Sequence, residues 1–296
     1  MELKSFRKII IIVGLLILFC LVWLWIIAPR FLKLHKDFSY KADIFSLDNF
    51  YDEIKQQFSG EKRSVTKFSY EVTDEKDGVL TVKNLFDVRK VTGEKIFAVE
   101  RLYGIDPNTG KHVSGYGDEA REGYLFAPRN LKKGESFTYW HINYDGPAHM
   151  VFVGEESLFR LPIYHYETHY EGIKIDQTAN LGFLPDVGKT RGVILEPHLE
   201  LWIEPVSGHM VKYTDDTIAY YYDLKTGVKL NPWNHFSNSY TPESISDQVK
   251  LAKQEKLMIR LIDFVVPALL ALLAVVILLW QYLKSKARLK VLNIIN

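Results

Sequence analysis

The feature that most constrains this chain is an apolar run without a charge, residues 264–283, near the C-terminal end. An α-helix rises about 1.5 Å per residue, so a run of this length crosses a hydrocarbon core of roughly 30 Å. Because lipid offers the backbone no hydrogen-bond partner, such a run crosses a bilayer only as a helix. A second apolar run, residues 9–28, lies near the other end, and the sequence therefore predicts two membrane anchors.

The first apolar run follows the basic residues Lys4, Arg7 and Lys8, as in a signal peptide. It is longer than the apolar region of an ordinary signal peptide, and no small-x-small cleavage site follows it. We therefore expect residues 9–28 to remain as a signal anchor, with a cleaved signal peptide as the alternative.

Two spans place both chain ends on one side of the membrane. Lys and Arg residues nearly balance on the two sides of each run, so the positive-inside rule does not select an orientation. A long polar loop is most simply exported, and we expect a plasma-membrane protein with both termini in the cytoplasm. The predicted segments besides the anchors are cytoplasmic tails at 1–8 and 284–296, an extracytoplasmic β-rich domain at 29–240 and a membrane-proximal helix at 241–263.

The net charge of +1 is unevenly distributed, with +5 in residues 1–36, +6 in residues 250–296 and −10 in residues 37–249. An acidic middle argues against a nucleic-acid partner and suits a cationic or neutral one. The single cysteine, Cys20, lies in the first apolar run, so the middle domain forms no internal disulfide or thiolate metal site. The chain also has no Asn-x-Ser/Thr sequon, and together these features favour a prokaryotic cell surface.

The middle of the chain reads mainly as β-structure. From Lys62 onward, Val, Thr, Phe and Tyr recur with a period of two between DG and TG turns, which predicts antiparallel strands. Before them, residues 47–58 are expected to form a short helix. Thr241-Pro-Glu is a typical helix start, and the helix it begins is expected to continue through residue 283. We therefore predict an α+β fold, with a mainly antiparallel β ectodomain (a meander or half-barrel-like sheet) between N- and C-terminal transmembrane helices.

One turn formula recurs three times. An acidic residue, two spacers, Thr or Ser, and then Gly occur at residues 106–110, 204–208 and 223–227. Glycine accepts the positive φ that closes such a turn, so each copy predicts a hairpin.

Several short motifs occur in a fixed order along the chain. They are YLFAP at 124–128, YW at 139–140, VGEE at 153–156, YHYE at 164–167 and WIEPVSG at 202–208. With the two terminal anchors, this order resembles the porin PorA family, formerly a domain of unknown function, which comprises actinobacterial and archaeal two-anchor membrane proteins. The resemblance covers most of the chain and implies a membrane protein, and it carries no catalytic residues over to this sequence.

Two weaker likenesses concern the plan of the chain. Its two anchors and large ectodomain are similar in topology to the CD36 scavenger-receptor class, whose ectodomains conduct lipid. The hairpins closed by the acid-to-glycine turn look like those of periplasmic lipid-carrier half-barrels. Both likenesses imply a lipid ligand.

The first candidate site is a set of metal ligands on one strand. The spacing His165-x-Glu167-x-His169 places two imidazoles and a carboxylate on one strand face, a residue set that holds divalent transition metals. His141, His149 and His209 are candidate additional ligands. The alternative is the solvent-facing side of an amphipathic strand.

The second candidate site is an aromatic sheet face that would bind lipid or isoprenoid, with the core under a helix as the alternative. The residues proposed for it are Tyr164, Tyr166, Tyr170, Trp202, Tyr213, Tyr220 and Tyr222.

The sequence supports binding better than catalysis. It contains no G-x-S-x-G, H-E-x-x-H, Walker A or dinucleotide-binding glycine motif, so we expect neither an enzyme nor a cofactor. The expected ligand is a lipid, an envelope polymer or a partner membrane protein, and the chain is a candidate homo-oligomer. Two alternatives stay open: an oligomeric channel or transport component, and a metal-dependent surface enzyme.

Overall fold

The computed structural model describes residues 2–174 and 190–295. The chain divides into two compact units. One contains the residues up to Lys33 and those from Leu257 onward, and the other runs from Leu34 to Lys256.

The first unit is helical. Its elements are α1 (Glu2–Val22), the π-helical turn η1 (Trp23–Ile27), α2 (Ala28–Leu32), the last turn of α3 (Pro242–Arg260), the π-helical turn η2 (Leu261–Val265) and α4 (Val266–Ile295). Helices α1 and α4 contact each other. The indole Nε1 of Trp23 donates a hydrogen bond of 3.0 Å to the backbone oxygen of Ile262, so a side chain from one π-helical turn binds the backbone of the other.

Within the described residues, two helices are long and apolar enough to cross a membrane. They are Ile11–Leu32 and the continuous helical stretch Pro242–Lys284. Both overlap the apolar runs predicted as anchors and are consistent with membrane anchoring. The boundaries of the spans and their orientation remain predictions.

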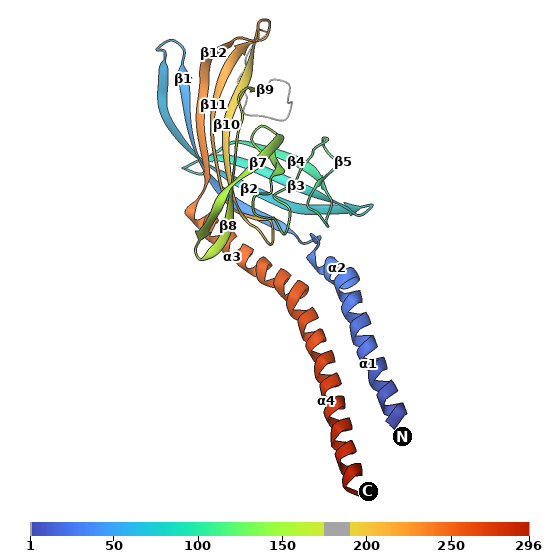
Figure 1. The fold of residues 1–296 in the computed structure, drawn as a ribbon. Coiled ribbons are helices and arrows are strands. Elements are labelled where there is room, and N and C mark those ends of the chain that lie inside the picture. The colour runs from blue at the N-terminus through green and yellow to red at the C-terminus, as the bar shows by residue number, and fades with distance from the viewer. Residues whose placement is uncertain (1, 175–189, 296) are drawn as a thin grey trace. The chain divides into compact units, whose positions relative to one another are not determined.

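The second unit is a twelve-stranded antiparallel sheet, which confirms the predicted fold class. Its spatial order is β5-β4-β3-β2-β1-β12-β11-β10-β8-β7-β6, with β9 paired to β10. Figure 1 shows the long strands β1 and β10–β12 running side by side. The strands are β1 (Ser39–Asp52), β2 (Gln57–Lys76), β3 (Val79–Lys90), β4 (Lys95–Ile105), β5 (His112–Gly117), β6 (Phe137–His141), β7 (Gly146–Leu158), β8 (Leu161–His169), β9 (Ile173–Lys174), β10 (Arg191–Glu204), β11 (His209–Asp223) and β12 (Lys229–Tyr240).

The predicted helix at residues 47–58 is wrong. The first half of that segment belongs to β1 and its last two residues to β2, and Leu47 lies opposite Ser237 of β12 and Arg63 of β2. The apolar spacing of Leu47, Phe50, Ile54 and Phe58 fits a helix locally. Leu47 instead pairs with strands on both sides and Phe50 pairs with Asn234 of β12, and this pairing in the sheet overrides the local preference.

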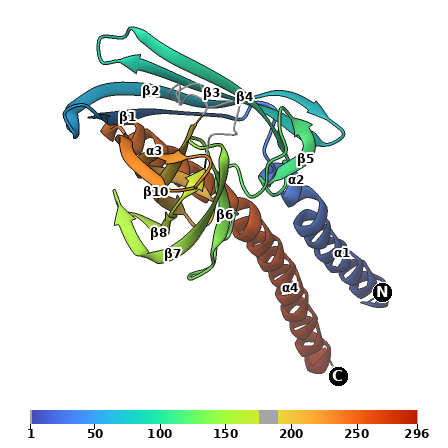
Figure 2. The same cartoon turned by 90° about the horizontal axis from the view of Figure 1, so that it is seen from above.

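The sheet bends so that its two ends approach each other. Figure 2 shows β2–β4 along the upper side of the β unit and β6–β8 along its lower side. Tyr124, in the segment between β5 and β6, bridges both ends: it pairs with Lys111 just before β5 and with Tyr139 of β6. The sheet therefore remains open in strand pairing, and the two bridges of Tyr124 link its ends across the opening.

A buried ion cluster ties the same two ends together, and we call it the arginine clasp. It consists of Arg101 in β4, Arg121 in the β5–β6 segment and Asp145 in the β6–β7 turn. The nitrogen–oxygen distances to Asp145 are 3.4 Å from Arg101 and 3.2 Å from Arg121, and Trp140 Nε1 donates a third contact of 2.6 Å. Burial raises the pKa of Asp145, but the hydrogen bonds from Arg121 and Trp140 and the charge of Arg101 outweigh it and hold the pKa below its usual value.

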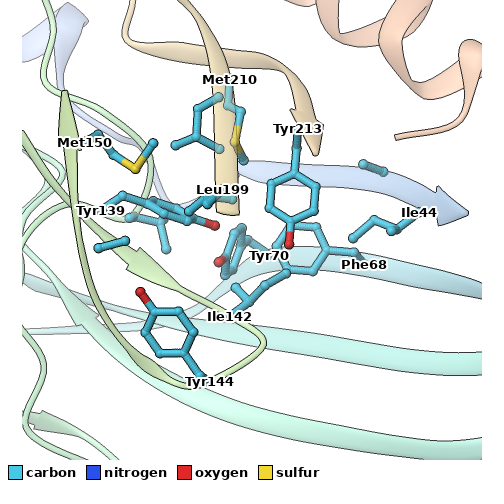
Figure 3. Packing of buried hydrophobic residues seen from close by; sticks show 14 of the residues in the cluster. Ile44, Phe68, Tyr70, Tyr139, Ile142, Tyr144, Met150, Leu199, Met210 and Tyr213 are labelled. Carbon is cyan, nitrogen blue, oxygen red and sulfur yellow. The ribbon is translucent and has the colours of Figure 1, made fainter. Parts of the chain in front are cut away.

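The main core fills the bend between the two ends of the sheet. Figure 3 shows side chains from opposite ends of the sheet meeting there, among them Phe68 of β2, Tyr139 of β6 and Leu199 of β10. Many of them are tyrosines. The hydroxyl groups of Tyr40 and Tyr240 bond to each other at 2.8 Å, whereas those of Tyr139 and Tyr166 have no hydrogen-bond partner among the described residues. Burial of this mostly apolar area is the main stabilising contribution to the β unit.

The other face of β8, β10 and β11 packs against α3. Trp202, Val211, Val249 and Ala252 belong to this second cluster. The helix begins as predicted, because the hydroxyl of Thr241 accepts the backbone N–H of Ser244 at 3.2 Å.

Candidate functional site

The structure contains a pocket of about 630 Å³ in the β unit. Its walls come from β1, β2, β3, β4 and β12, with Asn143 from the β6–β7 turn at one side. Alternate residues of β1, β2 and β12 explain its place. Ala42 and Ile44 of β1 belong to the core, and the next residues on that face, Ser46 and Asp48, line the pocket.

The pocket begins where the filling of the core ends. Ile142 and Tyr144 of the β6–β7 turn are core residues, whereas Asn143 between them lines the pocket. The Asn143 amide is fixed because it donates to Tyr213 Oη at 3.1 Å and to a carboxylate oxygen of Asp215. Asn143 therefore forms a rigid boundary between core and pocket.

Asp215 belongs to a fully buried polar network behind this boundary. Its carboxylate lies 3.3 Å from His141 Nε2 and accepts the hydroxyl of Thr217 at 2.6 Å. Burial raises the pKa of Asp215, but the charge and hydrogen bond of His141 and the other donors outweigh this and lower it overall. Asp215 is thus held as a carboxylate that anchors Asn143.

Aromatic and aliphatic side chains form much of the pocket wall. The Phe50 and Trp233 rings lie 6.4 Å apart between centroids, as do the Phe86 and Phe97 rings. Phe50, Phe86 and Phe97 are only half-buried, although they lie on the inner face of the sheet. The apolar residues of the lining are Phe50, Phe86, Val88, Val91, Ile96, Phe97, Trp233 and Phe236.

Two buried polar atoms in the lining have no hydrogen-bond partner among the described residues. They are Ser64 Oγ and Asn234 Oδ1, on side chains of residues that are 4% and 3% exposed. The Asn234 amide nitrogen donates to Asp48 Oδ1 at 2.8 Å, and burial raises the pKa of Asp48. Because an unsatisfied buried polar atom costs roughly 1–3 kcal/mol, these atoms favour a ligand that carries a polar group.

Three cations lie in the lining, namely Lys62, Arg63 and Lys90, and all three are exposed. Lys62 Nζ lies 5.1 Å from the centroid of the Phe50 ring, and Lys90 pairs with Glu94 at 2.7 Å. The pocket therefore combines an apolar interior with a basic rim, in a domain whose net charge is strongly negative.

The aromatic residues predicted as a ligand face do not form one surface. Tyr166 and Tyr213 are fully buried in the main core, and Tyr164 and Tyr170 pack against it. Trp202 lies in the cluster under α3. Tyr222 is buried and Tyr220 half-buried, under the ammonium groups of Lys174 and Lys229 respectively.

The three residues predicted as metal ligands do share one strand face, but their partners come from β10 and, for His165, also from Glu156 of β7. His165 stacks on Trp202 at 4.4 Å and lies 3.2 Å from Glu200. Glu167 lies 3.8 Å from His198, and the His169 and His198 rings are 6.0 Å apart. His198 and Glu200 were not among the predicted ligands, although they repeat the His-x-Glu spacing of β8.

The three additional histidines lie elsewhere. His141 pairs with the buried Asp215, and the exposed His149 lies on β7. His209 bonds to Gln248 at 2.8 Å and to Glu255 at 3.0 Å, both on α3. His209 therefore attaches α3 to β11.

Comparisons with known proteins bear on the family of the chain. Residues 119–283 match the family model described as Porin PorA. Among solved structures, a crystal structure of an exported protein with a YmcC-like fold from Bacteroides fragilis is similar at 9% sequence identity and a TM-score of 0.29, over 70% of this chain and 96% of that one. The comparison with curated proteins found no match. Because the family match spans more than half of the chain, as the ordered motifs predicted, this protein belongs to the porin PorA family.

Proposed function

We propose that this protein is a two-pass membrane protein of the cell surface whose β domain binds one amphiphilic lipid, and that it acts by binding rather than catalysis. The observation that carries the proposal is the pocket of about 630 Å³, which lies within the usual range of roughly 300–1,000 Å³ for small-molecule sites. Its apolar walls suit an acyl or isoprenoid chain. Its basic rim suits an anionic head group, and Ser64 and Asn234 suit a polar group on the ligand.

Lipid is favoured over the other two ligand classes expected from the sequence. A protein partner typically buries about 800 Å² of each surface, which needs a broad face rather than a pocket. An envelope polymer needs a groove that is open at two ends. The pocket instead stops at Asn143, which is fixed by Tyr213 and Asp215.

The test compares two phenylalanine substitutions on neighbouring residues of β2. Ser64→Phe places a large ring in the pocket, whereas Val65→Phe places it on the opposite face of the same strand. Full-length protein extracted in a mild detergent is analysed by native mass spectrometry for retained lipid. The proposal predicts about one retained lipid per chain in the wild type and in Val65→Phe, and its loss in Ser64→Phe.

Lipid that surrounds the helices is common to all variants, so only the difference between them counts. Ser64→Ala provides a variant with almost unchanged volume, and it is expected to keep the fold and to weaken lipid retention. Equal retention in Ser64→Phe and Val65→Phe, with both folded by circular dichroism, would contradict the proposal.

The family description favours a second candidate, an oligomeric channel. Residues 264–283 contain a single strongly polar side chain, Gln281, so one chain offers little to line a water-filled pore. A channel would therefore have to form between copies. Planar-bilayer recordings separate the two candidates, because a lipid-binding protein leaves the bilayer silent and a channel gives discrete conductance steps.

A further inference from the structure

A histidine and carboxylate cluster lies on the face of β8 and β10 that points away from the main core. Glu167 of β8 lies directly opposite Glu200 of β10 in the strand register. His198 lies two residues before Glu200 and therefore on the same face of β10. The sheet thus brings together three side chains that sequence spacing alone does not connect.

The three side chains are close enough to share one ion. One ligand atom from each of Glu167, His198 and Glu200 lies within 4.8 Å of the others. Two carboxylates directly opposite each other on a sheet repel, which destabilises the strand pair. A divalent cation between them would reverse the sign of that interaction.

The residues around the cluster hold its members in orientation. Thr214 of β11 donates its hydroxyl to Glu200 Oε2 at 2.8 Å. The other oxygen, Glu200 Oε1, lies 3.2 Å from His165 Nε2, and the second ring nitrogen of His165 lies 3.2 Å from Glu156 Oε1. A carboxylate on the far nitrogen of an imidazole is the usual support for a histidine that binds a metal.

We propose that Glu167, His198 and Glu200 bind a divalent transition metal, with zinc the best fit, and that His165 Nε2 supplies the fourth ligand. Imidazole nitrogen with carboxylate oxygen is a typical zinc donor set, whereas calcium and magnesium select oxygen alone. Two carboxylates neutralise the two charges of the ion. This site is independent of the pocket, because none of its four residues lines that pocket.

Isothermal titration calorimetry of zinc into full-length, tag-free protein in detergent micelles tests the site. A parallel titration with Co²⁺, followed by its visible absorption, provides a second readout. One equivalent is expected to bind. His198→Gln and Glu200→Gln each weaken the affinity at least tenfold, and Glu156→Gln weakens it by about tenfold through His165. Glu100→Gln is the matched control, because Glu100 of β4 pairs with Lys83 of β3, six strands from β10 in the sheet order, and the zinc affinity of this variant is expected to stay within twofold of the wild type.

All four substituted side chains are at least partly solvent-exposed, so the variants are expected to fold, and the melting temperature without metal checks this. No zinc binding by the wild type overturns the proposal. Equal affinities in the wild type, His198→Gln and Glu200→Gln also overturn it. Calcium binding as tight as zinc binding contradicts the choice of a transition metal.

Discussion

Single acidic residues close three hairpins of this domain, and in the first of them Asp106 accepts the backbone N–H of Asn108 and the hydroxyl of Thr109. The carboxylate of Asp223 accepts the backbone N–H groups of Lys225 and Thr226, and Glu204 does the same for Val206 and Ser207. The hydrogen bonds from Thr226 hold the pKa of Asp223 below its usual value. These turns were predictable from sequence because every interaction lies within five residues.

The glycines of these turns provide a prediction at the same scale. Gly208 and Gly227 have nearly equal φ angles of +74° and +72°, so alanine at either position costs roughly 1–2 kcal/mol of backbone strain. A Cβ at Gly208 would also lie 2.5 Å from the backbone oxygen of Ala127, whereas a Cβ at Gly227 meets nothing within 4 Å. Gly208→Ala is therefore expected to lower the free energy of unfolding by about 1–3 kcal/mol more than Gly227→Ala.

Urea unfolding of both variants, followed by tryptophan fluorescence, measures this difference. Equal destabilisation by the two substitutions would show that the turn at Gly208 does not pack against Ala127 as described.

Secondary-structure elements were predictable where the pattern was long and where local signals agreed with the sheet. The alternation of apolar and polar residues after Lys62 predicted the strands, and Thr241-Pro-Glu predicted the start of α3. The error at residues 47–58 arose because the helical spacing there is a local property. Pairing of β1 with β2 and β12 depends on residues that are distant in sequence.

The arginine clasp gives a prediction for the elements that it joins. Asp145→Asn leaves Arg101 and Arg121 buried without their carboxylate, which is expected to cost about 3–5 kcal/mol of unfolding free energy. Glu100→Gln is the control: it breaks the exposed ion pair of Glu100 with Lys83 and is expected to cost less than about 1 kcal/mol.

The loss of unfolding free energy in Asp145→Asn is expected to depend on pH in one direction. The pKa of Asp145 in the folded protein lies below its ordinary value of 3.8, so its stabilisation is complete above that pH and disappears as the pH falls through the folded pKa. The difference in unfolding free energy between wild type and Asp145→Asn should therefore be constant near neutral pH and shrink below about 3.8. A difference that is the same at pH 7 and at the lowest accessible pH would contradict the ionised clasp.

At the scale of the whole molecule, the sequence predicted two anchors, a mainly β domain and the family, but not the position of the candidate site. The predicted tyrosines, such as Tyr166 and Tyr213, alternate correctly and lie in the core. The pocket lies farther along the same inner face, where Ser64 and Asn234 replace core residues. The boundary between core and pocket depends on how far the side chains of the β6–β7 turn reach into the bend of the sheet. The periodicity of the strands carries no information about this.

The most direct measurement of the central claim is photo-crosslinking of the full-length protein with a lipid that carries a diazirine on its acyl chain, followed by peptide mapping. The account predicts labelled peptides from the membrane helices and, within the β domain, from the pocket walls around Phe50, Phe86 and Trp233. It also predicts that Ser64→Phe removes the label from the β domain and leaves the helices labelled. Labelling confined to the helices, or β-domain labelling that Ser64→Phe does not change, would contradict it.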